Sequence, residues 1–231
     1  MSSKKVIKLT AAQALIRFMI AQKVKINDEI KPLFPGVWAI FGHGNVAGIG
    51  EALFQHQEAL PTYRGQNEQS MAHAAIAYSK TLNRQQIMAC TSSAGPGSTN
   101  IVTAAALAHI NRIPLLLLPG DTFATRIPDP VLQQLEDNTD QTITTNDCFK
   151  PVSRFFDRIM RPEQLLTSLP QAIRVLTDPV DTGTVTIAFP QDVQTMSWNY
   201  PERFFEEKIH FLRRQHADEN QLKSAVQMII K

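Results

Sequence analysis

The sequence predicts an α/β protein in which a doubly wound parallel sheet carries helices on both faces. Three observations lead to this prediction. Short apolar segments recur along the chain, each is followed by a segment with helical spacing of apolar residues, and glycine-rich turns follow two of the apolar segments. Strands that are apolar without alternation are typical of parallel sheets, because both of their faces are buried.

The elements are predicted in order along the chain. Thr10 and Gln13 have the form of a capping box, and apolar residues then recur at helical spacing, so a first helix should run to about Lys23. The segment 121–149 is polar and is predicted to be a long surface excursion with a short helix after Pro130. The remaining strands are predicted at 37–42, 60–64, 87–93, 113–120 and 184–190, and the remaining helices at 46–57, 67–82, 98–110 and 162–176.

The length and composition define the domain organisation. With 231 residues and 43% hydrophobic content, the chain is long enough for one sizeable core, or for one domain and the beginning of another. We expect one domain over residues 1–195. Residues 196–231 are expected to be a linker, YPERFFEEKIHFLRRQH, followed by a truncated amphipathic helix that starts a next domain, which suggests a piece of a longer protein.

Charge and composition argue against several classes of partner. Lys and Arg total 23 against 21 Asp and Glu, so the net charge of +2 offers no basic face for nucleic acid. No apolar run reaches membrane-spanning length, and the N-terminus MSSKKVIKLT lacks the features of a signal peptide, so we expect a cytoplasmic protein. Cys90 and Cys148 have no CxxC or Cys/His spacing, and we expect both to be reduced.

The segment FGHGNVAGIG (41–50) places glycines between a strand and a helix. Its GxGxxxG spacing is near a dinucleotide fingerprint, but Tyr63-Arg64-Gly65 stands where such a site needs an acid for the ribose. A non-catalytic dinucleotide-binding module therefore stays open as an alternative. The glycines also suit a tight turn off a strand end, or a flat ligand lying against the backbone.

A second turn, SSAGPGSTN (92–100), again joins a strand to a helix. Ligands of open α/β sheets bind outside such strand ends. No Lys follows as in a phosphate-binding loop, and no GxSxG elbow surrounds Ser92 or Ser93, which argues against nucleoside triphosphates and against a serine hydrolase. The histidines at 43, 56, 73 and 109 lack paired spacing, so no metal site is expected.

A lone acid, Glu68, stands at the predicted start of the helix 67–82, with only Arg64 as a cationic neighbour in the sequence. The simplest interpretation is an acid in the first helical turn, where the helix macrodipole favours negative charge by about 0.3–1 kcal/mol. The residues alone do not distinguish this role from a catalytic one.

Four segments together resemble a known family. GHGN (42–45), GQNEQSMAHAAIAYSK (65–80), TSSAGPGSTNIVTAAA (91–106) and TVTIAFPQDVQ (184–194) resemble the pyrimidine-binding domain of thiamine diphosphate enzymes of the acetolactate synthase type. The resemblance covers about residues 5–200 and is strongest to a branch of inositol catabolism. It implies hydrolysis of a C–C bond in a cyclic 1,2-diketone, giving a 5-deoxy-hexuronate. A carboligase or decarboxylase of the acetolactate synthase type is the alternative within the family.

The resemblance also implies roles for individual residues. Glu68 would donate to or share a proton with N1′ of the cofactor's aminopyrimidine, which favours the tautomer that removes the proton from C2 of the thiazolium. Such proton sharing works best in apolar surroundings without a cationic neighbour. Gly44 and Asn45 would line the pyrimidine or substrate side. The residues implied to flank the reaction pocket are Ser92, Gly95, Pro96 and Asn100.

The family holds Mg²⁺ and the diphosphate through a Gly-Asp-Gly motif and a later Asn in a separate C-terminal domain. Gly120-Asp121 with Asn146 has similar spacing, but Thr122 replaces the second glycine and the residues lie in the wrong domain. We expect a coincidence, and no metal ligand in this chain. The resemblance implies that the active site is completed by a neighbouring subunit of a homo-oligomer, which pairs through this domain, and that the fragment alone is inactive.

Overall fold

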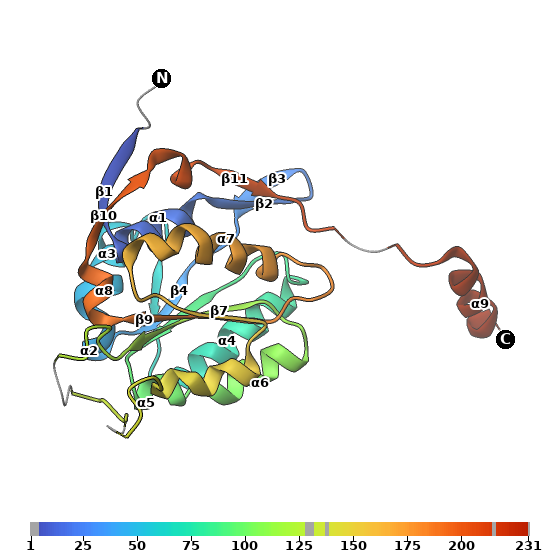
Figure 1. Ribbon diagram of the computed structural model, residues 1–231. Helices are drawn as coiled ribbons and strands as arrows, with labels where there is room; N and C mark the ends of the chain where they lie inside the picture. The colour runs from blue at the N-terminus through green and yellow to red at the C-terminus, as the bar shows by residue number, and fades with distance from the viewer. Residues whose placement is uncertain (1–4, 128–131, 137–138, 214–215, 231) are drawn as a thin grey trace.

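The computed structural model describes residues 5–127, 132–136, 139–213 and 216–230, and its centre is a six-stranded sheet (Figure 1). All neighbouring strands of this sheet are parallel. In spatial order the strands are β5 (Thr62–Arg64), β4 (Val37–Ile40), β6 (Ala89–Ser92), β7 (Leu115–Asp121), β9 (Thr184–Pro190) and β8 (Phe155–Arg158). Strand β5 lies on one side of β4 and β6 lies on the other, so the direction in which strands are added reverses between β4 and β6.

Helices cover both faces of the sheet, which confirms the predicted doubly wound architecture. Figure 1 shows α1 and α7 on one face and α4 and α6 on the other. Two separate clusters of buried apolar side chains correspond to these faces. The first cluster includes α1 (Ala11–Ala21), α3 (Glu51–Gln55) and α7 (Leu165–Leu176), and the second includes α4 (Glu68–Thr81) and α6 (Val102–Ile110).

Strand β7 shows why the sequence of these strands is continuously apolar. All of its residues are buried. Leu116 and Leu118 belong to the cluster under α1 and α7, while Leu115 and Leu117 belong to the cluster under α4 and α6. Because successive side chains point to opposite faces, a strand covered on both sides has no position for an exposed polar residue.

The helix start that was predicted from the capping box at Thr10 is present, and the structure shows a second cap at Asn67. Thr10 Oγ1 accepts from the backbone N–H of Gln13, and Gln13 Oε1 accepts from the N–H of Thr10, at 3.2 and 3.0 Å. At the start of α4, Asn67 Oδ1 accepts from the N–H of Ser70 at 3.0 Å. These bonds satisfy backbone donors that a helix leaves unpaired in its first turn.

Two predicted helices are each divided. The helix expected at 46–57 is preceded by α2 (Gly42–Asn45), continues as a π-helical turn at Val46–Gly50 and ends as α3. The helix expected at 98–110 consists of α5 (Pro96–Thr99) and α6. Both divisions fall within the glycine-rich segments 41–50 and 92–100, so each helix begins inside the loop that follows a central strand.

The predicted surface excursion 121–149 lies partly outside the described residues, as does the start of the helix expected after Pro130. Residues 132–136 of this segment form turns rather than a helix. The excursion ends in a 3₁₀ helix, Thr145–Val152, which begins with a capping box formed by Thr144 and Asp147. This helix packs on α6 and β7 and returns the chain to β8.

The chain after residue 195, expected to be a linker, forms further strands. The short helix α8 (Gln191–Thr195) is followed by β10 (Ser197–Pro201), which pairs antiparallel with β1 (Val6–Thr10). After a 3₁₀ turn at Glu202–Phe205, β11 (Lys208–His210) pairs with β2 (Gln22–Ile26), which also pairs with β3 (Glu29–Pro32). Tyr200 is fully buried, and its hydroxyl donates to the carbonyl oxygen of Pro162 at 2.9 Å.

The final helix, α9 (Glu219–Ile230), has the amphipathic spacing that the sequence predicts, and all of its residues are exposed. A short 3₁₀ turn at Pro162–Gln164 precedes α7. Within the described part of the chain, no helix combines the length and apolar character needed to cross a membrane.

Candidate active site

The loops after β4 and β6 lie side by side at the point where the strand order reverses. The backbone N–H of Gly44 donates to Ser93 Oγ across these loops at 3.4 Å. In open α/β sheets, the reversal opens a crevice outside the carboxyl ends of the strands, and ligands bind there. The sequence placed both glycine-rich turns at strand ends, and the structure brings them together.

Glu68 is the first residue of α4 and lies beside the second of these loops. Its side chain is half-buried, and its Oε2 accepts from Nδ2 of Asn100 at 2.8 Å. None of the ion pairs among the described residues includes Glu68, and Arg64 is exposed. The carboxylate is therefore held by a neutral amide donor rather than by a cation.

The space in front of Glu68 depends on a glycine. A Cβ on Gly97 would stand 3.3 Å from Glu68 Oε1 and 3.8 Å from Cβ of Ser92. Ser92 is fully buried, and its Oγ has no hydrogen-bond partner among the residues that the structure describes. Gly97 thus leaves space beside one carboxylate oxygen that a larger residue would fill.

Asn45, which the resemblance places on the pyrimidine or substrate side, is fully buried. Its Nδ2 donates to Thr91 Oγ1 at 2.7 Å and to the carbonyl oxygen of Ser92 at 2.6 Å, and Thr91 donates onward to Leu118. Its Oδ1 accepts from Gln194 Nε2 at 2.9 Å. The amide therefore ties the loop after β4 to β6 and β7, with no donor left over.

Gln194 is a site residue for which no role was predicted. Its Nε2 also donates to the carbonyl oxygens of Gly44 and Phe189, at 3.0 and 2.9 Å, and its Oε1 accepts from the N–H of Ile49 at 3.2 Å. Gly48 must be a glycine because a Cβ there would collide with the Gln194 side chain. The segment FPQDVQ was part of the resemblance, but only the fold shows that its last Gln reaches across to the loop after β4.

Gly95 and Pro96 shape the loop after β6. Gly95 has φ +64°, a backbone conformation that suits glycine, and a Cβ there would collide with the carbonyl oxygen of Gln133. Pro96 is the first residue of α5, where its missing N–H costs nothing, and it is exposed. Gly44 is buried beneath the loop, with Ala94 N 2.9 Å from the position a Cβ would take.

Gly120, Asp121 and Asn146, the apparent metal motif, form a structural network. The Asp121 carboxylate accepts from Arg158 Nε at 2.7 Å, and Asn146 Nδ2 donates to the carbonyl oxygen of Gly120 at 2.8 Å. Burial raises the pKa of Asp121, and the adjacent Arg158 guanidinium opposes that rise. Arg158 also binds Asp147, so the network fixes the end of the excursion to β7 and β8. Among the described residues, no cluster of three His, Cys, Asp or Glu could hold a metal ion.

The two cysteines are free, and the structure gives neither a reactive environment. Cys90 is buried in the sheet, and burial raises the pKa of its thiol. Burial also raises the pKa of Cys148. Both thiols are therefore protonated at neutral pH, and thiolate chemistry at this site has no support.

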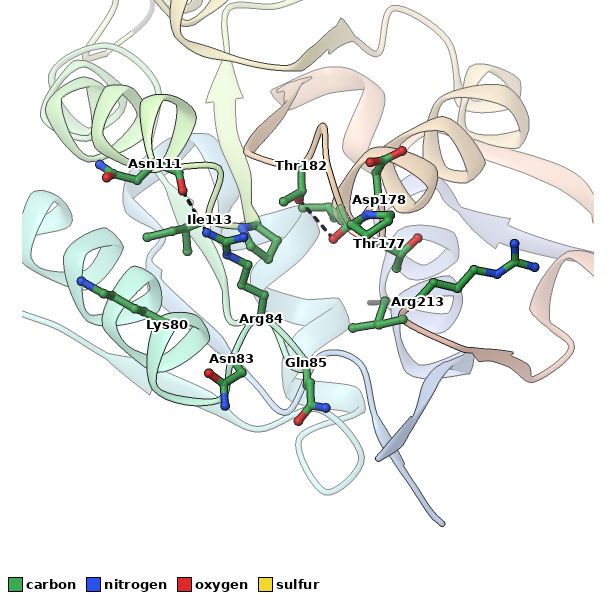
Figure 2. A pocket seen from close by; sticks show the side chains of 14 residues that line it. Lys80, Asn83, Arg84, Gln85, Asn111, Ile113, Thr177, Asp178, Thr182 and Arg213 are labelled. Atoms are coloured by element: carbon green, nitrogen blue, oxygen red, sulfur yellow. Dashed lines mark hydrogen bonds between the residues drawn. The ribbon is translucent and has the colours of Figure 1, made fainter. Parts of the chain in front are cut away.

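A cavity of about 580 Å³ lies at the opposite end of the strands, where β6, β7 and β9 begin. Figure 2 shows the side chains that line it. Arg84 reaches into it, and its Nη2 donates to the carbonyl oxygen of Asn111 at 3.2 Å. Helices α4, α6 and α7 end at this cavity, and basic side chains such as Lys80 complement the negative ends of their dipoles. Lys80 is 12 residues beyond Glu68 on α4, about 18 Å along the helix. The cavity is therefore separate from the crevice at the strand reversal.

The fold and this crevice define a class of protein. Residues 36–142, which span β4 to the excursion after β7, match the family model described as "Thiamine pyrophosphate enzyme, N-terminal TPP binding domain". The parallel sheet, and the loops at the carboxyl ends of its strands, agree with this match.

Individual relatives carry a more specific name. The chain is 52% identical over 223 residues to proteins named 3D-(3,5/4)-trihydroxycyclohexane-1,2-dione hydrolase from Bacillus anthracis and from Bacillus thuringiensis (strain Al Hakam). It is equally similar to "3D-(3,5/4)-trihydroxycyclohexane-1,2-dione hydrolase 1" of Bacillus cereus (strain ZK / E33L). Each alignment covers 96% of this chain and 35% of the relative, so the chain spans about a third of the length of these relatives.

Proposed function

We propose that this chain is the N-terminal, pyrimidine-binding part of a thiamine diphosphate-dependent hydrolase that cleaves a C–C bond in a cyclic 1,2-diketone. The names of its relatives support this substrate class. The observation that supports the proposal most strongly is the Glu68 carboxylate beside the loop after β6, with Oε2 held by Asn100 and Oε1 next to Gly97.

The residues present fit an aminopyrimidine ring. Gly97 leaves a cradle that a Cβ would narrow, and Oε1 of Glu68 has no partner among the described residues. When bound, thiamine diphosphate supplies a carbon nucleophile that no side chain can provide. Glu68 would lie against a ring nitrogen of the bound cofactor and could share a proton with it.

The other residues of the crevice have different roles in this proposal. Ser92 is fully buried, and its hydroxyl has no hydrogen-bond partner among the described residues, so it belongs to the floor of the site. Gly44, Gly95 and Pro96 shape the two loops so that backbone lies close to the ligand. Asn45 acts indirectly, because its amide is fully engaged within the protein and fixes the loop after β4.

The remaining parts of the active site belong to the proposal as well. Mg²⁺ and the diphosphate are bound by a domain outside this chain, and a neighbouring subunit of a cytoplasmic homo-oligomer brings that domain to the crevice. We propose a domain over residues 1–195 to which β10 and β11 are added, since they pair with β1 and β2. The remainder of 196–231 leads into the next domain, of which α9 is the first helix.

The experiment that tests the proposed function uses the full-length protein and 3D-(3,5/4)-trihydroxycyclohexane-1,2-dione. Ring opening should require both thiamine diphosphate and Mg²⁺, and it should consume one water per substrate. The acetolactate synthase alternative is tested in parallel by measuring CO₂ release from 2-oxo acids. Ring opening at the same rate without the cofactor would overturn the proposal, and so would decarboxylation without ring opening.

A further inference from the structure

Asn100 stands between α5 and α6, on a different element from the acid that it contacts. It follows the last residue of α5, and its backbone N–H donates to the carbonyl oxygen of Pro96 at 3.1 Å. Its side chain is half-buried and donates to Glu68 Oε2 at 2.8 Å. The backbone hydrogen bond fixes the position of Asn100, and the side-chain amide then contacts the carboxylate of Glu68.

The contact uses one of the two oxygens of Glu68 and orients the other. Rotation about the last bond of a glutamate side chain has only broad minima, so a free carboxylate samples many orientations. A hydrogen bond from an amide to a charged oxygen is short and directional, and it removes that freedom. With Oε2 held at Asn100, Oε1 lies beside Gly97, 3.3 Å from the position that a Cβ there would take.

We propose that Asn100 is a positioning residue that acts through Glu68, and that it does not itself bind the cofactor. The inference rests on the proposed function, since it assigns to Asn100 the orientation of the acid on which that function depends. Because Asn100 orders the Glu68 side chain before the ligand binds, less side-chain entropy is lost on binding. A misplacement of about 1 Å in such a group costs about 10²-fold in rate.

The test is a double-mutant cycle in the full-length protein, with Asn100→Ala, Glu68→Gln and the double variant. The measured quantities are the exchange of the cofactor C2 proton into deuterated water and the dissociation constant of thiamine diphosphate with Mg²⁺. Asn100→Ala should slow exchange roughly 10- to 10²-fold, the cost of a misplaced catalytic group. Its dissociation constant should change less than about threefold, because the diphosphate is bound elsewhere. In the Glu68→Gln background, adding Asn100→Ala should slow exchange by less than about twofold, since residues that act as a unit are not additive.

Two matched variants separate a missing donor from a disturbed loop. Asn100→Asp keeps the size of the side chain but replaces the donor with a second carboxylate, and it should slow exchange at least as much as Asn100→Ala. Thr99→Ala, at an exposed neighbouring position whose hydroxyl donates only to the carbonyl oxygen of Pro96, should leave exchange at the parent rate. Slow exchange in Thr99→Ala would overturn the inference, because it would show that any change in this loop disturbs the site.

A second readout needs no cofactor. In the cofactor-free full-length protein, the side-chain amide protons of Asn100 should exchange slowly with solvent by NMR, and Glu68→Leu should make that exchange fast. If Glu68→Gln exchanges the C2 proton at the parent rate, the proposed function itself fails. If Glu68→Gln is slow while the effect of Asn100→Ala is absent or simply multiplies with it, the positioning role of Asn100 is overturned and the proposed function survives.

Discussion

The role of Asn45 leads to a prediction that the structure makes quantitative. Replacing Asn45 with alanine removes the donor to the carbonyl oxygen of Ser92 and the acceptor for Gln194 Nε2. Thr91 and Gln194 keep other partners, at Leu118 and Phe189, so the main loss is the donor to the backbone oxygen of Ser92. One unsatisfied buried group costs about 1–3 kcal/mol. The lost side-chain atoms add a small cavity, and the expected total is about 2–4 kcal/mol.

The assay is urea unfolding of the 231-residue chain, followed by circular dichroism. Asn199→Ala is the control, because Asn199 is exposed on β10 and its replacement should change the free energy of unfolding by less than about 0.5 kcal/mol. The folded full-length Asn45 variant should bind thiamine diphosphate with a dissociation constant close to that of the parent, because Asn45 does not contact the cofactor in this proposal. Unchanged stability together with a loss of affinity would refute the reasoning and restore Asn45 as a direct cofactor contact.

Three further predictions concern single positions. Glu68→Gln in the full-length protein should slow C2-proton exchange by ~10²–10⁴-fold, which is the contribution of one proton-transfer group. The free energy of unfolding should change by less than about 1 kcal/mol. Exchange at the parent rate would show that Glu68 is only a charge at the helix start. Gly95→Ala should lower the free energy of unfolding by about 1–3 kcal/mol, because the new Cβ meets the carbonyl oxygen of Gln133 and the φ value is strained; wild-type thermal stability would contradict this. Arg158→Met should cost about 3–5 kcal/mol at pH 7 and less at pH 4 in urea titrations. The reason is that burial already raises the pKa of Asp121, so the stability lost without Arg158 grows as the pH rises above the pKa of the unfolded carboxyl; an equal cost at both pH values would refute it.

The elements that the sequence predicts well are those with a local cause. The buried parallel strands are visible as continuous apolar runs, and Thr10 marks the start of α1 through its capping box. Strand β8 and the pairing of β1 with β10 were not predicted. Apart from Tyr200, their residues are partly buried or exposed, and their stability comes from partners that are distant in the sequence.

The candidate site shows the same division. Glu68 and the two glycine-rich turns could be found from the sequence, since helix starts and glycines have local signatures. The resemblance included Asn100 but could not show that its partner is Glu68, 32 residues earlier in the chain. Gln194 donates to Asn45, 149 residues earlier in the chain, and no local sequence pattern predicts a contact over that separation. Long-range side-chain hydrogen bonds are therefore the part of the site that required the fold.

The pairing of β1 with β10 has a consequence for how the chain is made. Val6 lies opposite Pro201, and Thr10 lies opposite Ser197. A ribosome adds about 5–20 residues per second, so roughly 10–40 s pass between the emergence of β1 and that of its partner. During that interval β1 is an edge without a neighbour on a nascent chain, where it can pair with the wrong strand or be captured by a chaperone. The first strand of the domain is thus completed only once residues 197–201 have been made and have left the ribosome, so slow translation of the codons just beyond 201 would lengthen the time that β1 spends unpaired.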